Sequence, residues 1–309
     1  MSGADVEAFL SKKYQNNEEV KGALIDLFSR YRDWGLADRD FDTKLTNEEH
    51  YEASIWEMVL ADHLNDLGHE LSSDDEGPDI GLTYDGQRIW VEAVCPKPEG
   101  IPEHWLNIRS IKEPVCLRKV PHEEMLLRWT SAIKEKKEKL TGRILNSGKR
   151  QPGYLEKETI GRNEPYVIAV SSCRLGFGCD FLHEGISELP YAVEAAFPVG
   201  PVEIVFDREK AAVTEQRLSY RATIKKPNGS EVPTDSFFNP EYQGVSAILG
   251  TPAGINHACG TKAPFALVHN PLAINKLPVG ILGADQEYIA TEVGDSYELH
   301  DVSKKASEE

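Results

Sequence analysis

Residues 77–94 read GPDIGLTYDGQRIWVEAV, a pattern of two strand-like runs joined by a tight turn. Asp85-Gly86 is a strong signal for a two-residue type I′ turn, and strand-forming residues lie on both sides of it. We therefore predict a β-hairpin whose strands are residues 80–84 and 87–94. Because side chains alternate along a strand, the aliphatic residues share one face, which we expect to be core. The polar residues share the other face, which we expect to carry chemistry.

Two acidic residues face each other in this predicted hairpin. With Asp85 and Gly86 as the loop, the register pairs Asp79 with Glu92. Directly opposed Cβ atoms are roughly 4.5–5.5 Å apart, so like charges there destabilise a sheet unless a cation lies between them. A divalent cation is one interpretation, because hard cations prefer carboxylate and carbonyl oxygens. The other is that Asp79 is solvated at the strand end while Glu92 pairs with Arg88.

A third acid lies on the helix predicted before the hairpin. Thr46 and Glu49 form a capping-box pattern and Gly68 follows the last apolar residue, so residues 47–67 are predicted to be helical. Glu57 lies beside the apolar stripe of this helix, which is an expensive position for an unpaired carboxylate. The structural interpretation is a glutamate at the boundary of the stripe that reaches solvent or an arginine.

A second long helix is predicted over residues 123–140. Its apolar stripe includes Trp129 and Ile133, and at 3.6 residues per turn Lys136 falls within this stripe, whereas Lys134 lies outside it. A lysine on the buried side of a helix is unusual. The structural interpretation is that its side chain snorkels along the apolar surface to reach water.

The remaining pattern predicts the fold class. The continuous apolar run Tyr166–Ser171 is typical of a buried central strand, and several shorter strand candidates follow it. We therefore predict an α/β protein with a mixed central β-sheet flanked by helices. Three regions are expected: an N-terminal helical segment (residues 1–45), a core (46–171) and a strand-rich C-terminal part packed on the core (172–309).

The acids and the order of elements resemble the PD-(D/E)XK nuclease superfamily, which has the restriction-endonuclease-like fold. The proline–aspartate pair that ends at Asp79, together with Glu92 on the next strand, is similar to the metal-binding motif of that family. The resemblance covers residues 46–171, which makes this region a nuclease-like core. It implies that Asp79 and Glu92 bind Mg²⁺ or Mn²⁺, and that Glu57 supplies a further metal ligand from the preceding helix.

One position departs from the family motif. A lysine two residues after the glutamate normally assists the attacking water, and here Val94 occupies that position. Some members of the superfamily present the lysine from the helix after the glutamate strand, so the resemblance implies that Lys136 is the catalytic lysine. Arg128 lies on the row of the same helix that includes Lys136, and we expect it to hold the scissile phosphate.

Length and composition exclude several classes of protein. The chain has 309 residues, enough for one large α/β domain or two small ones. It has no run of about 18 apolar residues, so no membrane span is expected. The first residues lack the apolar segment of a signal peptide, which predicts a cytoplasmic protein. The five cysteines show neither CxxC pairs nor zinc-ligand spacing, and we expect them to be reduced and mostly buried.

The charge pattern leaves three functions open. The net charge of −17 argues against a general nucleic-acid binder, although residues 101–157 hold 13 Lys and Arg against 7 Asp and Glu. The leading hypothesis is a metal-dependent nuclease acting on DNA, with Asp79, Glu92 and Lys136 as catalytic residues. The second is a catalytically degenerate nuclease fold used for nucleic-acid binding or protein assembly, which Val94 favours. The third is an acidic protein-interaction module.

Overall fold

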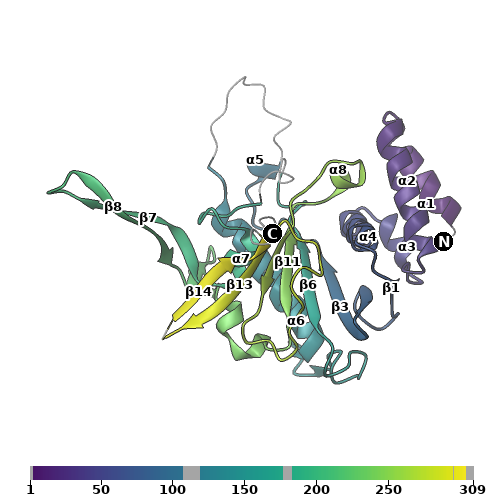
Figure 1. The fold of residues 1–309 in the computed structure, drawn as a ribbon. Coiled ribbons are helices and arrows are strands. Elements are labelled where there is room, and N and C mark those ends of the chain that lie inside the picture. Colours follow the sequence, from purple (N-terminus) through teal and green to yellow (C-terminus); the bar gives the residue numbers. More distant parts are fainter. Residues whose placement is uncertain (1–2, 107–118, 177–182, 295, 304–309) are drawn as a thin grey trace.

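The computed structural model describes residues 3–106, 119–176, 183–294 and 296–303 and shows an α/β fold built on a large mixed sheet (Figure 1). Within these residues the sheet has eight strands, in the order β1-β2-β3-β6-β11-β12-β13-β14. The pairs β3/β6, β6/β11 and β12/β13 are parallel and the other neighbouring strands are antiparallel. The strands are β1 (Leu71–Ser72), β2 (Ile80–Tyr84), β3 (Gln87–Val94), β6 (Tyr166–Ser171), β11 (Ala247–Thr251), β12 (Ala266–His269), β13 (Gln286–Val293) and β14 (Ser296–Asp301).

Helices cover the sheet on both faces, as the sequence predicts. Helices α1 to α4 lie together on one side of the sheet in Figure 1, and α4 contacts β3, α2 and α8. Helix α6 contacts β3 and β6 on the other face, and α7 contacts β11. None of the described helices is long and apolar enough to span a membrane. The helices are α1 (Gly3–Lys13), α2 (Glu18–Asp33), α3 (Phe41–Leu45), α4 (Tyr51–Asp66), α5 (Glu103–Leu106), α6 (His122–Thr141), α7 (Tyr191–Ala196) and α8 (Ile255–Ala258).

The central hairpin has the predicted turn and register. Asp85 and Gly86 both have positive φ angles, 48° and 76°, as a type I′ turn requires. Pairing runs from this turn to Ile80 and Val91. The local turn signal therefore fixes which residues of β2 and β3 lie side by side.

Away from its turn the hairpin is buried on both faces, so the face that was expected to carry chemistry is covered by α6. Val91 and Ala169 belong to the hydrophobic cluster under the N-terminal helices, whereas Trp90 and Ile168 belong to the cluster under α6 and α7. Adjacent residues of β3 and β6 thus contribute to opposite layers. By this alternation Glu92 lies on the face that α6 covers.

Helix α4 begins later than predicted. The capping-box interpretation of Thr46 is wrong, because residues Phe41–Leu45 form the separate helix α3 and Thr46 ends it. The hydroxyl of Thr46 donates to the carbonyl oxygen of Asp42 at 2.9 Å, and α4 starts at Tyr51. The predicted end is confirmed, since Gly68 has a φ of 84° directly after the helix.

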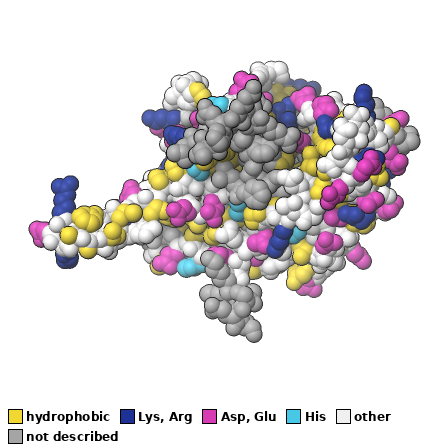
Figure 2. Space-filling model, turned by 90° about the horizontal axis from the view of Figure 1, so that it is seen from above, with side chains coloured by type: hydrophobic (Ala, Val, Ile, Leu, Met, Phe, Trp, Pro, Cys, Tyr) yellow, Lys and Arg dark blue, Asp and Glu magenta, His cyan; other side chains and the backbone are white. Residues whose placement is uncertain are grey.

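The C-terminal half adds the last four strands of the sheet and a projecting ribbon. Strands β7 and β8 pair with each other and extend away from the body, with hydrophobic side chains visible along the arm (Figures 1 and 2). Ile204 and Phe206 on this arm are 63% and 56% exposed. The remaining short elements are β4 (Arg143–Ile144), β5 (Arg150–Gln151), β7 (Val199–Asp207), β8 (Ala212–Tyr220), β9 (Thr223–Lys225), β10 (Glu231–Pro233), η2 (Ser236–Phe238) and η3 (Pro240–Tyr242).

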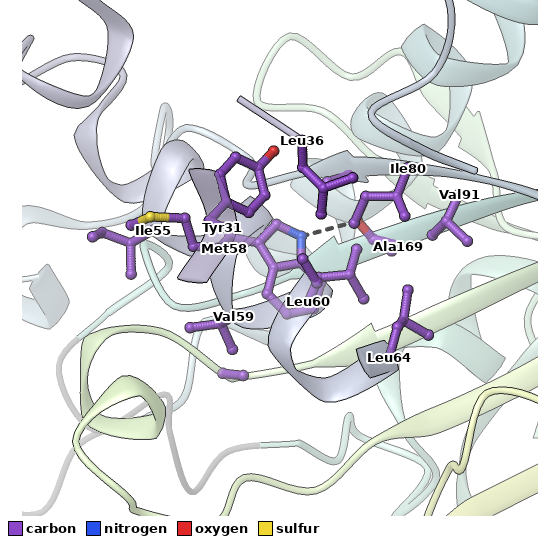
Figure 3. Packing of buried hydrophobic residues seen from close by; sticks show 14 of the residues in the cluster. Tyr31, Leu36, Ile55, Met58, Val59, Leu60, Leu64, Ile80, Val91 and Ala169 are labelled. Carbon is purple, nitrogen blue, oxygen red and sulfur yellow. Dashed lines mark hydrogen bonds between the residues drawn. The ribbon is translucent and has the colours of Figure 1, made fainter. Parts of the chain in front are cut away.

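Trp56 joins α4 to the centre of the sheet. Its side chain is fully buried, and its indole N–H donates to the carbonyl oxygen of Ala169 on β6 at 3.2 Å. This bond is the dashed line that ends at Ala169 in Figure 3, among the aliphatic side chains of the same cluster. The helix that carries Glu57 is therefore held to the sheet by both apolar packing and a specific hydrogen bond.

We expect Trp56→Phe to lower the free energy of unfolding by about 1–3 kcal/mol, because it removes this hydrogen bond and leaves a cavity. Urea denaturation followed by circular dichroism measures the change. Trp34→Phe, at a partly buried tryptophan, is the control and should cost about 0.5 kcal/mol. Equal losses for the two variants would contradict the structural role of the bond to Ala169.

Candidate active site

Glu92 is the centre of the site. Its side chain has no exposed surface, although it is a carboxylate in the middle of a sheet. Its Oε1 atom accepts hydrogen bonds from the ammonium groups of Lys136 at 2.6 Å and Lys139 at 2.8 Å. Burial alone would raise the pKa of Glu92, but the two lysines outweigh it and lower the pKa below its usual value. The group is therefore ionised and paired.

Both lysines come from α6, three residues apart on one side of the helix. The contact predicted between Lys136 and Glu92 is present, and the Lys136 side chain is only 10% exposed. Lys139 is 44% exposed and reaches the same oxygen from the rim. Burial alone would lower the pKa of Lys139, but Glu92 raises it above its usual value. Sequence reasoning missed Lys139, although its spacing of three from Lys136 puts it on the same face of the helix.

Tyr154 completes the surroundings of Glu92. Its hydroxyl donates to Oε2 of Glu92 at 3.2 Å, and its backbone N–H donates to the carbonyl oxygen of Lys139. Burial, together with the charge of Glu92, raises the pKa of Tyr154 well above its usual value. The short β4–β5 hairpin in the segment after α6 folds back to place Tyr154 on the site, and no local sequence pattern indicates this contact.

Asp79 lies beside Glu92, one residue beyond the last hairpin pair. It is half-buried, and its Oδ2 atom accepts a hydrogen bond from the backbone N–H of Ala93 at 2.7 Å. Burial and then the charge of Glu92 raise the pKa of Asp79 to about 6. The interpretation of Asp79 as a freely solvated residue at a fraying strand end is wrong, because this hydrogen bond ties its carboxylate to β3. So is the alternative pairing of Glu92 with Arg88, because Arg88 donates to the hydroxyl of Ser72.

Glu57 reaches the same region from α4. It is half-buried, and burial, reinforced by the charge of Asp79, raises its pKa to about 8. Lys44 and Lys136 act in the opposite direction but do not compensate for these effects. The structure thus brings together the three acids that the sequence singled out. For Glu57 and Asp79, the raised pKa means that the ionised form is destabilised at this position.

Two cavities meet at this cluster, and their charges differ. The first, of about 360 Å³, includes Asp79 and is lined by eight acids and four Lys or Arg residues. The second, of about 490 Å³, includes Lys136 and is lined by four acids and five Lys or Arg residues. Glu57, Glu135 and Lys139 line both cavities, whereas Glu92 lines neither. The first cavity suits a cation and the second suits an anion such as a phosphate group.

Arg128 lines the second cavity, together with Val94 and Lys136. Its guanidinium donates to Glu99 at 3.3 Å and to the hydroxyl of Ser131 at 3.2 Å. The Glu99 side chain is 73% exposed, and ion pairs of this kind contribute little to stability. An anion that enters the cavity can therefore compete for Arg128.

The donor atoms of the site fit a hard cation, although they are not gathered around one position. Within the described residues, no group of three or more His, Cys, Asp or Glu side chains is arranged to hold a metal ion. Oε1 of Glu92 instead pairs with the ammonium groups of Lys136 and Lys139. Three acids still face these two lysines at the centre, which leaves an excess of carboxylate oxygens, the atoms that Mg²⁺ and Mn²⁺ prefer.

We expect Lys136→Met to lower the free energy of unfolding by about 2–4 kcal/mol, because it removes one buried partner of an ionised carboxylate. Lys134→Met on the same helix is the control, since Lys134 is 66% exposed and its nearest acid is 3.9 Å away. It should change stability by less than about 0.5 kcal/mol. Chemical denaturation of both variants at pH 7 measures the difference, and equal small effects would contradict the buried ion pair.

We expect the metal-free protein to lose stability as the pH rises between about 4.5 and 8, because the folded state then holds a proton on Glu57 that the unfolded state has released. Glu57→Gln keeps the shape and removes this titration. The variant should therefore melt higher than the parent at pH 8.5, and the difference should shrink towards pH 5. Thermal melts across this range in buffer with a chelator provide the measurement. A constant difference at all pH values would show that Glu57 is not the group responsible.

The expectation of a PD-(D/E)XK nuclease site rests on the sequence pattern of Asp79 and Glu92 and on the order of elements around them. Comparisons with known proteins gave no match to a family model, to a curated protein or to a solved structure.

Proposed function

We propose that this protein is a divalent-metal-dependent nuclease that hydrolyses phosphodiester bonds of DNA on a restriction-endonuclease-like core. The order of elements supports this core, since the β2–β3 hairpin is followed by the long helix α6 and then by β6, which is parallel to β3. Helix α4 precedes the hairpin and brings Glu57 to the same place. These are the elements that the superfamily uses to build its active site.

The observation that carries the proposal is the position of Lys136. The family motif needs a lysine at the acid pair, and Val94 cannot supply an ammonium group. Lys136 reaches Glu92 from α6 at 2.6 Å, although the two residues are 44 positions apart in the chain. A buried lysine on an apolar helix face is costly, and its presence beside two further acids is typical of a functional site.

Each residue has a role in this proposal. Asp79, Glu92 and the backbone carbonyl of Ala93 would hold Mg²⁺ or Mn²⁺, with Glu57 assisting from α4. The ion would neutralise charge on the phosphate and lower the pKa of the attacking water. Lys136, once released from Glu92, is placed to donate a hydrogen bond that orients this water.

The phosphate group of the substrate would enter through the second cavity. The excess of Lys and Arg there is favourable for an anion, whereas the first cavity would repel it. Arg128 would hold a non-bridging phosphate oxygen through its guanidinium. In a chain with a net charge of −17, this cavity, with five Lys or Arg residues against four acids, is a locally less repulsive entrance for a polyanion.

A second function is favoured by the same ion pairs. Lys136 and Lys139 already neutralise Glu92, so the site is electrostatically satisfied at that carboxylate without a metal. With Val94 in the lysine position, this arrangement suits a catalytically degenerate nuclease fold that binds nucleic acid or assembles with proteins. Metal binding separates the two functions, because only the first requires a cation between Asp79 and Glu92.

We expect purified protein to bind Mn²⁺ and to cleave DNA in Mg²⁺ or Mn²⁺ but not in chelator. Asp79→Asn should reduce cleavage at least about 100-fold, because it removes a charge that faces the cation. It retains an oxygen for the N–H of Ala93 and removes a carboxylate whose burial disfavours ionisation, so its melting temperature at pH 8 should not fall. Asp75→Asn, at an exposed acid of the same cavity, is the matched control and should cleave normally.

Isothermal titration with Mn²⁺ and gel assays on single- and double-stranded DNA provide the two measurements. Salt-dependent DNA binding without metal binding or cleavage would favour the degenerate fold. The absence of metal binding, DNA binding and cleavage would reject the nuclease and any role in DNA binding, and of the two functions only protein assembly by a degenerate fold would then stand. Equal cleavage by Asp79→Asn and the parent would reject this site even if a nuclease activity is present.

A further inference from the structure

Two cysteines that are far apart in the sequence lie in contact beside the second cavity. The Sγ atoms of Cys95 and Cys173 are 3.3 Å apart, and neither residue takes part in a disulfide. A disulfide bond is about 2.05 Å long, so a shift of about 1.3 Å would join them. Nothing in the proposed reaction uses either thiol, and the sequence gives no CxxC signal for the pair.

The backbone fixes both thiols in place. Cys95 directly follows β3 and Cys173 lies two residues after β6, and these parallel strands pair as far as Val94 and Val170. The backbone N–H of Cys173 donates to the hydroxyl of Ser171 at 3.2 Å. The two sulfur atoms are therefore held together by the ends of neighbouring strands rather than by a mobile loop.

The backbone at Gly254 also packs closely against Cys173. A Cβ atom at Gly254 would lie only 2.8 Å from the Cβ of Cys173, so the backbone on that side is in close contact. Cys95 is 7% exposed and lines the second cavity, whereas Cys173 is partly exposed. An oxidant can thus reach Cys173 from solvent, and Cys95 is the buried thiol positioned to react next.

We propose that Cys95 and Cys173 form a reversible disulfide when the protein meets a peroxide. The Cys173 thiolate attacks the peroxide oxygen, the O–O bond breaks, and Cys173 becomes a sulfenic acid while water leaves with hydrogen peroxide as oxidant. The sulfur of Cys95 then attacks the sulfenic sulfur, forms the S–S bond and releases a second water. Two thiols and one hydrogen peroxide give one disulfide and two waters, and a dithiol reverses the change.

This inference is independent of the proposed nuclease function, because the product is a covalent bond that mass spectrometry detects directly. Cys259 provides the internal comparison, since it is a free, partly exposed cysteine. It also forms no hydrogen bond through sulfur to any residue of the described chain.

The experiment uses the full chain, reduced and then treated with a few equivalents of hydrogen peroxide, with remaining thiols blocked by iodoacetamide. Peptide mapping should show a Cys95–Cys173 linked peptide that dithiothreitol removes, while Cys259 is recovered mainly as the alkylated form. Cys259→Ser should give the same linked peptide. Cys95→Ser and Cys173→Ser should abolish it, with each fold checked by circular dichroism.

Three results would overturn the proposal. One is complete alkylation of Cys95 and Cys173 at peroxide levels that oxidise Cys259. Another is a linked peptide that joins either cysteine to a different cysteine of the chain. The third is a disulfide between two copies of the protein, which non-reducing electrophoresis would show as a dimer. Because the decisive measurement is made on the parent protein, it stands even if a serine variant does not fold.

Discussion

The buried carboxylate of Glu92 is the constraint on which the rest of this structure depends. Burying a charge in a sheet that is covered on both faces is costly unless partners replace the lost water. Two ammonium groups from α6 and the hydroxyl of Tyr154 are those partners. These contacts set which side of α6 faces β3, and they hold the segment between α6 and β6 against the site. This ion cluster thus connects three parts of the chain: the β2–β3 hairpin, helix α6 and the segment between α6 and β6.

The neighbouring acids show that this cluster is not optimised for stability. Asp79 and Glu57 have pKa values raised to about 6 and 8, because each is partly removed from water and close to another carboxylate. A purely structural network would pair each acid or leave it in water. Acids with shifted pKa values in a cavity are typical of sites that bind a cation or transfer protons. The lysines can therefore be understood as partners that hold the site together in the absence of a ligand.

Strand order explains why several reactive groups gather in one place. The parallel strands β3 and β6 end at the same edge of the sheet, and in open α/β sheets this edge is where ligands bind. Ala93, Val94 and Cys95 line the second cavity at that edge, and Cys173 follows the neighbouring strand. The acids approach from the hairpin start and from α4, so the two cavities of opposite charge meet there. The site is a product of this convergence rather than of any single motif.

The sequence by itself determined the features that depend on neighbours in the chain. The Asp85-Gly86 turn fixed the hairpin register, the 3.6-residue period placed Lys136 on the buried face of α6, and an apolar run marked β6. Even local signals failed where two elements competed, as at Thr46, which ends α3 instead of starting α4. Tertiary structure alone decided that Tyr154 reaches Glu92 and that Cys95 meets Cys173. Those contacts span 62 and 78 positions, and they arise from how packed layers bring strand ends together, which no short window of sequence encodes.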